Sequence, residues 1–276
     1  MLAHDAARAA GGRFLLRIED LDATRARPEF EAAIFEDLRW LGLRWEEPVL
    51  RQSTRAPAYA AALAALAARG LTYPCACTRR DILEAASAPQ ETVPGLPPGP
   101  EGPDGLPYPG TCRRMPPDPA LPHAIRLDMA AAVAALGGPE AVRALGFAEI
   151  GGGPHGETGP QRLDPDWLLL RCGDPVLARK DAAAAYHLAV TVDDAHQGVT
   201  HVTRGEDLFG AAFLHRLLQA LLGLPTPAYR HHRLIRDASG RRLAKRDRDA
   251  GVRELREAGE TPAGIRARLG LPPAPG

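Results

Sequence analysis

The stretch from Ser87 to Pro122 constrains the fold of this chain more than any other. It is dominated by Pro, Gly and polar residues, and it lacks the spacing of apolar side chains that a helix or strand needs to bury one face. Such a segment cannot build a hydrophobic core by itself, and it would gain most from a metal clip. We therefore predict a loop-rich insertion into a larger domain.

Helical and strand patterns alternate on both sides of this segment. Apolar side chains at helical spacing predict helices over residues 28–41, about 53–69 and 213–222, with Gly70 and Gly223 ending the last two. Short apolar runs predict strands at residues 14–18, 124–127, 167–171 and 186–192. This alternation predicts an α/β fold, in which helices cover the faces of a sheet.

Length and charge narrow the class of protein. With 276 residues, 45% of them hydrophobic and 25% charged, the chain is long enough for one large domain and a small subdomain. It contains no apolar run of about 18 residues and no secretory signal, which predicts a cytoplasmic protein with no membrane partner. The formal net charge is zero, so binding to nucleic acid would require a local basic surface.

Cys75 and Cys77 precede the Pro- and Gly-rich stretch, and Tyr108 and Cys112 lie near its far end. Four convergent donors would bind Zn²⁺ and clip the insertion together, with His123 as an alternative fourth donor. The pattern Cys-x-Cys is weak by itself, and two buried cysteines with one exposed thiol is the competing interpretation. The remaining cysteine, at position 172, lies in an apolar run and is expected in the core.

Charged residues follow the apolar runs at three places in the chain. They are Glu19, Asp20 and Asp22, then Asp193 and Asp194, then Arg204, Glu206 and Asp207. Ligands of open α/β sheets bind beyond the carboxyl ends of the strands, so these side chains predict a polar crevice. Carboxylates that cap the next element are the competing interpretation.

The segment from Tyr229 to Asp249 is the most basic part of the chain, and we expect a basic loop after Gly240. Lys180 and Lys245 are the only lysines of the sequence, so Lys245 indicates a point contact with a phosphate. Such a loop can fold over a polyphosphate and neutralise charge that develops during nucleotidyl transfer. A solvated basic face is the competing interpretation.

Several of these stretches occur in the order found in the glutamyl-tRNA synthetase family of class I aminoacyl-tRNA synthetases, and the chain resembles the catalytic core of that family. The matching stretches are FLLRIEDLDATR, EDLRWLGLRWEEP, RQSTR, YPCACT, AYHLAVTVDDA, HVTRGEDL and GRRLAKR. The resemblance implies a Rossmann-type catalytic domain with a zinc-bearing insertion. It also implies ATP-dependent activation of L-glutamate, with Mg²⁺ accompanying the ATP.

The resemblance also implies roles for individual residues. Glu19 would hold the ammonium group of glutamate, and Tyr186 and Arg204 would line the glutamate pocket, where an arginine fork suits a carboxylate. Lys245 lies in a stretch similar to the family's KMSKS-type loop. It would contact ATP and stabilise the phosphates in the adenylation transition state.

Within the family, the chain is similar to shortened members that transfer glutamate to the queuosine base of tRNA(Asp). Cys75, Cys77, Tyr108 and Cys112 match the zinc-ligand pattern of those members. The sequence ends about 30 residues after the basic loop, so we expect it to lack the helical anticodon-binding domains of a full glutamyl-tRNA synthetase. The resemblance implies tRNA(Asp) carrying queuosine, L-glutamate and ATP as partners, and we expect a monomer.

The N-terminal end departs from the family's pattern. Residues 2–10 have the pattern of the end of a helix, and no HIGH motif or preceding strand is present, so we expect the first strand to be missing and the natural start to lie upstream. The predicted organisation is a catalytic domain over residues 1–74 and 123–249, the zinc-binding insertion over 75–122, and a C-terminal helical segment over 250–276.

Two other functions stay open from the sequence. One is an adenylate-forming ligase that moves glutamate to a different acceptor. The other is an inactive relative that binds RNA or glutamate, which would agree with the missing HIGH motif.

Overall fold

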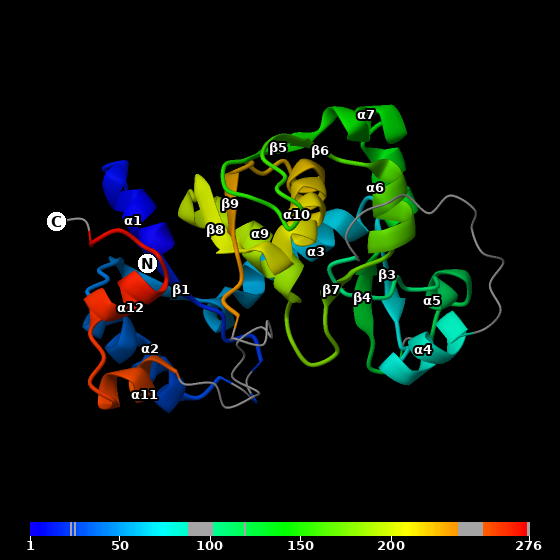
Figure 1. The fold of residues 1–276 in the computed structure, drawn as a ribbon. Coiled ribbons are helices and arrows are strands. Elements are labelled where there is room, and N and C mark those ends of the chain that lie inside the picture. Colours follow the sequence, from blue (N-terminus) through cyan, green and yellow to red (C-terminus); the bar gives the residue numbers. More distant parts are fainter. Residues whose placement is uncertain (23, 25, 88–101, 119, 237–250, 275–276) are drawn as a thin grey trace. The chain divides into compact units, whose positions relative to one another are not determined.

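The computed structural model describes residues 1–22, 24, 26–87, 102–118, 120–236 and 251–274. The chain forms two compact units (Figure 1). Unit 1 comprises Met1–Thr54 and Leu234–Gly276, and unit 2 comprises Arg55–Arg233. None of the helices in the described ranges has the length and apolar character that a membrane span requires.

Unit 1 contains a two-stranded sheet in which β1 (Leu15–Ile18) pairs in parallel with β2 (Glu46–Arg51). The α-helices of its described residues are α1 (Leu2–Ala9), α2 (Pro28–Trp40), α11 (Val252–Glu257) and α12 (Pro262–Arg268). Arg256 contacts Glu36 at 2.9 Å and joins α11 to α2, while Arg266 contacts Asp5 at 2.6 Å and joins α12 to α1. The strand predicted at residues 14–18 and the helix predicted at 28–41 are confirmed.

The larger sheet of unit 2 has four strands in the order β6-β5-β9-β8. They are β5 (Gly146–Glu149), β6 (Gly159–Arg162), β8 (His201–Gly205) and β9 (Ala228–His232). Strands β5, β9 and β8 run parallel to one another, and β6 is antiparallel to β5. The carboxyl ends of three parallel strands therefore meet at one edge, where open α/β sheets bind their ligands.

Helices α3 (Ala56–Ala67), α9 (Tyr186–Gln197) and α10 (Phe209–Leu222) contact one another beside this sheet (Figure 1). The 3₁₀ turns η1 (Gln52–Arg55) and η3 (Glu206–Leu208) precede α3 and α10. Gly70 and Gly223 follow the ends of α3 and α10 with φ of +68° and +66°, as predicted from the sequence. The apolar face of α10 packs on the sheet, where Ala212 meets Phe147 and Tyr229.

Two of the predicted strands are helical. Residues 186–192 lie in α9, and residues 167–171 lie in α8 (Pro165–Trp167) and a π-helical turn, η2 (Leu168–Cys172). The reason is burial on every side, since the first half of α9 is buried at nearly every position and leaves no polar face to reveal a helical period. The strand predicted at 124–127 is confirmed.

A second, antiparallel sheet of unit 2 has the order β3-β4-β7, with β3 (Thr72–Cys75), β4 (Ala124–Leu127) and β7 (Val176–Ala178). Cys75 pairs with Ala124, so the two ends of the predicted insertion leave the sheet side by side. Helices α4 (Arg79–Ser87) and α5 (Thr111–Arg114) lie near these strands, and α6 (Met129–Ala135) and α7 (Pro139–Ala144) follow β4 (Figure 1).

Candidate active site and metal centre

The three cysteines predicted as metal ligands lie together. The thiol sulfurs of Cys75, Cys77 and Cys112 all lie within 4.8 Å of one another. Pairing of β3 with β4 holds Cys75 at the base of the insertion, and Gly110, with φ of +75°, starts the short helix that carries Cys112. All four cysteines are free, and Cys172 is buried in the core as expected.

Tyr108 completes this group of donors. Its hydroxyl oxygen lies 3.3 Å from the Cys77 sulfur and accepts a hydrogen bond of 2.9 Å from the backbone N–H of Cys112. The guanidinium carbon of Arg126 lies 3.9 Å from the centre of the tyrosine ring. His123, the alternative donor, is not in the group, and its Nδ1 lies 2.9 Å from the carbonyl oxygen of Leu121. Tyr108 is therefore the fourth candidate ligand.

The thiols of this group differ in how readily they lose a proton. Burial raises the pKa of Cys77 to about 11. Burial acts the same way on Cys112, but the Tyr108 hydroxyl and the backbone N–H of Ala76 outweigh it and lower the pKa of Cys112 to about 7. The two sulfurs lie 3.4 Å apart, so the Cys77 thiol can donate to a Cys112 thiolate. Three cysteines and a phenol oxygen that converge in this way fit a closed, tetrahedral zinc site.

Tyr186 and Arg204, the two residues predicted to line the glutamate pocket, lie on either side of one histidine. Tyr186 is the first residue of α9, and its ring centre lies 5.9 Å from that of His215 on α10. Arg204 lies near the carboxyl end of β8, with its Nη1 3.2 Å from Nδ1 of the same imidazole. The structure thus brings both predicted residues to one point, beside the carboxyl ends of the parallel strands.

Arg204 is held on two of its nitrogens, and its third has no hydrogen-bond partner among the residues that the structure describes. Its Nε donates to Nε2 of His231 at 3.1 Å, and its guanidinium carbon lies 5.0 Å from the ring centre of Tyr229. Within the described part of the chain, Nη2 is buried without a hydrogen-bond partner. A buried guanidinium N–H without an acceptor destabilises the folded protein. The carboxylate of a ligand could accept this hydrogen bond.

Glu149, which the sequence did not single out, anchors this arrangement from β5. It is 1% exposed, and its carboxylate accepts bonds from the backbone N–H groups of Gly151 and His231 at 2.8 and 3.0 Å and from Nδ1 of His231 at 2.6 Å. Burial and the Arg204 guanidinium lower the pKa of His231, although Glu149 opposes the shift. His231 is therefore neutral at physiological pH.

The other predicted site residues are placed differently. Glu19 follows β1 in unit 1 and accepts a bond of 3.3 Å from Arg17, so its role toward glutamate stays a prediction. Lys245 and the basic loop around it lie outside the described residues. Asp193, expected in the polar crevice, is fully buried on α9, where it accepts bonds from the Tyr59 hydroxyl at 2.6 Å and from Arg55 at 3.1 Å. These bonds join α9 to Tyr59 of α3 and to Arg55 just before it.

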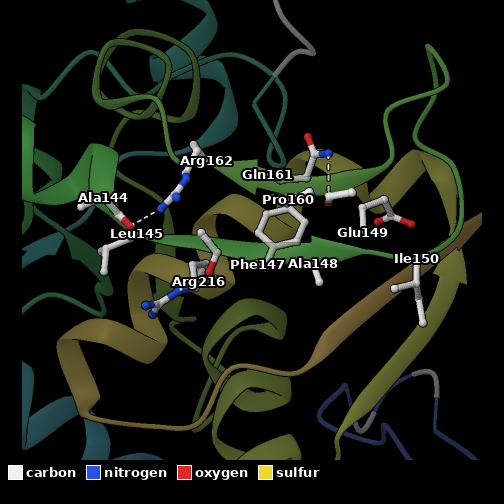
Figure 2. Close-up of a pocket in the computed structure, with 12 residues that line it drawn as sticks. Ala144, Leu145, Phe147, Ala148, Glu149, Ile150, Pro160, Gln161, Arg162 and Arg216 are labelled. Atoms are coloured by element: carbon white, nitrogen blue, oxygen red, sulfur yellow. Dashed lines mark hydrogen bonds between the residues drawn. The ribbon is translucent and has the colours of Figure 1, made fainter.

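A groove of about 540 Å³ runs along β5 and β6, and Glu149 is among the residues that line it (Figure 2). Its two arginines are engaged with the backbone. Arg162 donates to the carbonyl of Ala144 at 2.7 Å, and Arg216 donates to the carbonyl of Gly146 at 2.9 Å. The lining residues include none of the predicted ligands, so this groove is not the predicted glutamate pocket.

Comparison with known proteins agrees with this architecture. The model of the family "tRNA synthetases class I (E and Q), catalytic domain" matches residues 1–94 and 168–272. A protein of Rhodobacter capsulatus named glutamyl-Q tRNA(Asp) synthetase is 52% identical over 98% of this chain and 92% of its own length. A protein of the same name from Nitratidesulfovibrio vulgaris is 41% identical over 98% of this chain and 79% of its own length.

A solved structure shows the same fold. The glutamate-tRNA synthetase from Elizabethkingia anophelis superimposes with a TM-score of 0.65 at 24% sequence identity, covering 89% of this chain. This chain spans about half of that one, 48% of its length. The expected class I catalytic-domain fold is confirmed. On the family model and the relatives together, the chain belongs to the class I tRNA synthetases of the E and Q type.

Proposed function

We propose that this protein activates L-glutamate with ATP and transfers the glutamyl group to the queuosine base of tRNA(Asp). Relatives that align over nearly the whole chain carry the name of this activity. The structural observation that best supports it is Arg204, whose buried Nη2 faces no acceptor among the described residues while its other nitrogens are held by histidines. A guanidinium in this state fits a carboxylate substrate.

The proposed reaction has two steps. An α-carboxylate oxygen of glutamate attacks the α-phosphorus of ATP, and the bond to pyrophosphate breaks to leave glutamyl-adenylate. A hydroxyl of the queuosine ring then attacks the glutamyl carbonyl, loses its proton, and releases AMP. Arg204 and Tyr186 would hold the amino acid, Glu19 would accept its ammonium group, and Lys245 would neutralise phosphate charge in the first step.

Glutamate-dependent exchange of label between pyrophosphate and ATP tests the first step. We expect exchange with L-glutamate and much less with L-glutamine, which lacks the second carboxylate. Labelling of tRNA(Asp) with radioactive glutamate tests the second step, and we expect it only for tRNA that carries queuosine. Equal labelling without queuosine would favour a ligase with another acceptor. Absence of exchange would favour a non-catalytic relative that binds RNA or glutamate.

We also propose that Cys75, Cys77, Tyr108 and Cys112 bind one Zn²⁺ per chain. The convergence of their donor atoms supports this, because a tetrahedral zinc site needs four ligand atoms that meet at one point. Bound zinc would replace the missing hydrophobic core of the insertion. Arg126, stacked on the Tyr108 ring, would offset part of the negative charge of the ligands.

Metal analysis of matched variants tests the zinc proposal. We expect the purified protein and the variant Cys172→Ala to contain one zinc per chain, because Cys172 is buried away from the group. Cys112→Ser should lose the metal and become sensitive to proteolysis in the insertion. Wild-type protein that stays folded and metal-free in a zinc-containing medium would refute the proposal.

A further inference from the structure

A chain of polar side chains crosses the carboxyl ends of β5, β9 and β8 in unit 2; four of them are buried, Arg204 is partly buried, and Asp104 is exposed. Each member contacts the next, and the order is Glu149, His231, Arg204, His215, His187 and Asp104. The three imidazoles are 2%, 2% and 5% exposed, so their hydrogen bonds are made within the protein and not to solvent. This chain of side chains has a carboxylate at each end, Glu149 and Asp104, and the guanidinium of Arg204 between them.

The chemistry of arginine determines where the protons lie on one side of Arg204. A guanidinium only donates hydrogen bonds, so Nε2 of His231, 3.1 Å from Nε of Arg204, must accept and carries no proton. The remaining proton of the ring then lies on Nδ1, which donates to Glu149 at 2.6 Å. His231 is therefore a neutral ring of the Nδ1–H form.

The same reasoning applies on the other side of Arg204. Nδ1 of His215 accepts from Nη1 of Arg204 at 3.2 Å, so the proton of this ring lies on Nε2. That N–H donates to Nδ1 of His187 at 3.0 Å, which leaves the His187 proton on Nε2, directed at the carboxylate of Asp104 at 3.3 Å. A single proton arrangement satisfies all these contacts, and in it all three rings are neutral.

We propose that His187, His215 and His231 are positioning residues that orient Arg204 without neutralising it, so that its positive charge is kept for the carboxylate of the substrate. This inference rests on the proposed function. Arginines in proteins are often held by Asp or Glu, which would cancel the charge and compete with a bound carboxylate. A neutral imidazole accepts the same N–H group and orients it equally well. Here the two carboxylates are kept one and two rings away.

Tyr186 is oriented by the same rings. Its ring packs edge-on against that of His187 with centres 5.2 Å apart and tilted against that of His215 at 5.9 Å. The same histidines therefore fix the orientation of both Arg204 and Tyr186, the two residues predicted to line the glutamate pocket. Displacing His215 should move both the charge and the aromatic wall of the pocket.

The insertion supplies the last acceptor of this chain. Asp104 lies in a tight turn in which Gly105 N–H donates to the Gly102 carbonyl at 2.9 Å. A Cβ at Gly102 would lie 2.2 Å from the carbonyl oxygen of Arg171, so only glycine lets the turn approach the core this closely. The carboxylate that fixes the proton of His187 thus comes from the segment that also carries Tyr108.

Substitutions at His215 separate orientation from charge. In His215→Asn the side-chain oxygen can replace Nδ1 as a neutral acceptor for Arg204, and in His215→Asp an acceptor of nearly the same shape carries a negative charge. We expect His215→Asn to change the KM for glutamate in pyrophosphate exchange by only a few-fold. We expect His215→Asp to raise it by about tenfold or more with a smaller change in kcat, because one added charge opposes the substrate carboxylate.

His196→Asn is the matched control, since His196 is exposed on α9 and does not belong to this chain of polar side chains, and its substitution should leave both constants unchanged. Equal effects of His215→Asn and His215→Asp on KM would overturn the proposal, because the rings would then serve packing alone. Direct titration with glutamate should reproduce the difference as a change in Kd.

Nitrogen-15 NMR of the histidine rings gives a readout that does not depend on activity. We expect neutral rings at neutral pH, with the proton on Nδ1 of His231 and on Nε2 of His187 and His215. A charged ring or an opposite tautomer at any of them would overturn the inference, even if glutamate exchange is normal. The assigned tautomers without glutamate-dependent exchange would instead contradict the proposed function, and with it the purpose assigned to the rings.

Discussion

Glu149→Gln should destabilise unit 2 although it removes no side-chain atom. In the native protein, Oε1 accepts from two backbone N–H groups and Oε2 accepts from Nδ1 of His231. The glutamine oxygen can keep the two backbone bonds, but its NH₂ group then faces the N–H of His231, and two donors meet. If the imidazole proton moves to Nε2 to avoid this, it meets the Nε–H of Arg204, and two donors meet there instead.

The expected loss of stability follows from the number of buried donors that are left without an acceptor. Every proton arrangement leaves one buried donor without an acceptor, which costs about 1–3 kcal/mol of the free energy of unfolding. Glu149→Ala loses all three bonds of the carboxylate and leaves a cavity, so its cost should reach about 3–5 kcal/mol. Glu140→Gln, on the exposed side chain of Glu140, is the control and should stay within about 0.5 kcal/mol of wild type.

Urea unfolding followed by circular dichroism measures these differences through the unfolding midpoint and slope. The KM for glutamate of Glu149→Gln should also rise, because a proton on Nε2 of His231 repels the Nε–H of Arg204 and displaces the guanidinium. A Glu149→Gln variant as stable as Glu140→Gln would refute the proton assignment. A cost equal to that of Glu149→Ala would show that the two backbone bonds are lost as well.

Three further predictions use the same stability measurement. Tyr59→Phe removes a buried hydrogen bond of 2.6 Å to Asp193 and should cost about 1–3 kcal/mol, and an unchanged midpoint would contradict this. Gly151→Ala places a Cβ 2.2 Å from the carbonyl oxygen of His231 and should cost about 1–3 kcal/mol, whereas Gly152→Ala, with open space around it, should cost much less. Because the pKa of His231 is lowered on folding, stability should be fully present above about pH 6.5 and fall as the pH drops below that value, by up to about 1.4 kcal/mol per pH unit. The variant His231→Gln should lack this contribution, and an identical pH dependence in the two proteins would count against it.

Local patterns in the sequence correctly predicted three of the helices and the two strands at residues 14–18 and 124–127. The helix at residues 56–67 and that at 209–222 show an apolar face and a glycine stop, both of which act within a few residues. The prediction of a strand at residues 186–192 is wrong, because these residues form the first half of helix α9. That helix is surrounded by protein, so the contrast between apolar and polar positions that reveals a helical period is absent.

The candidate ligands were predicted in two different ways. Cys75, Cys77, Tyr108 and Cys112 were predicted from residue type and spacing, and the structure brings their donor atoms together. Tyr186 and Arg204 were predicted from stretches that resemble a family, and the structure places them beside one histidine. In both cases the residue type and the short motif around each residue were enough to single it out.

The residues that hold Arg204 could not have been predicted in this way. Glu149, His187, His215 and His231 are scattered over two strands and two helices, and none of them has a neighbour in sequence that reveals its partner. Residue type and motif were therefore enough to predict the residues that could bind a carboxylate or a metal ion. The hydrogen bonds that orient Arg204 could be found only in the folded chain, because the carboxyl ends of parallel strands bring together side chains that are distant in sequence.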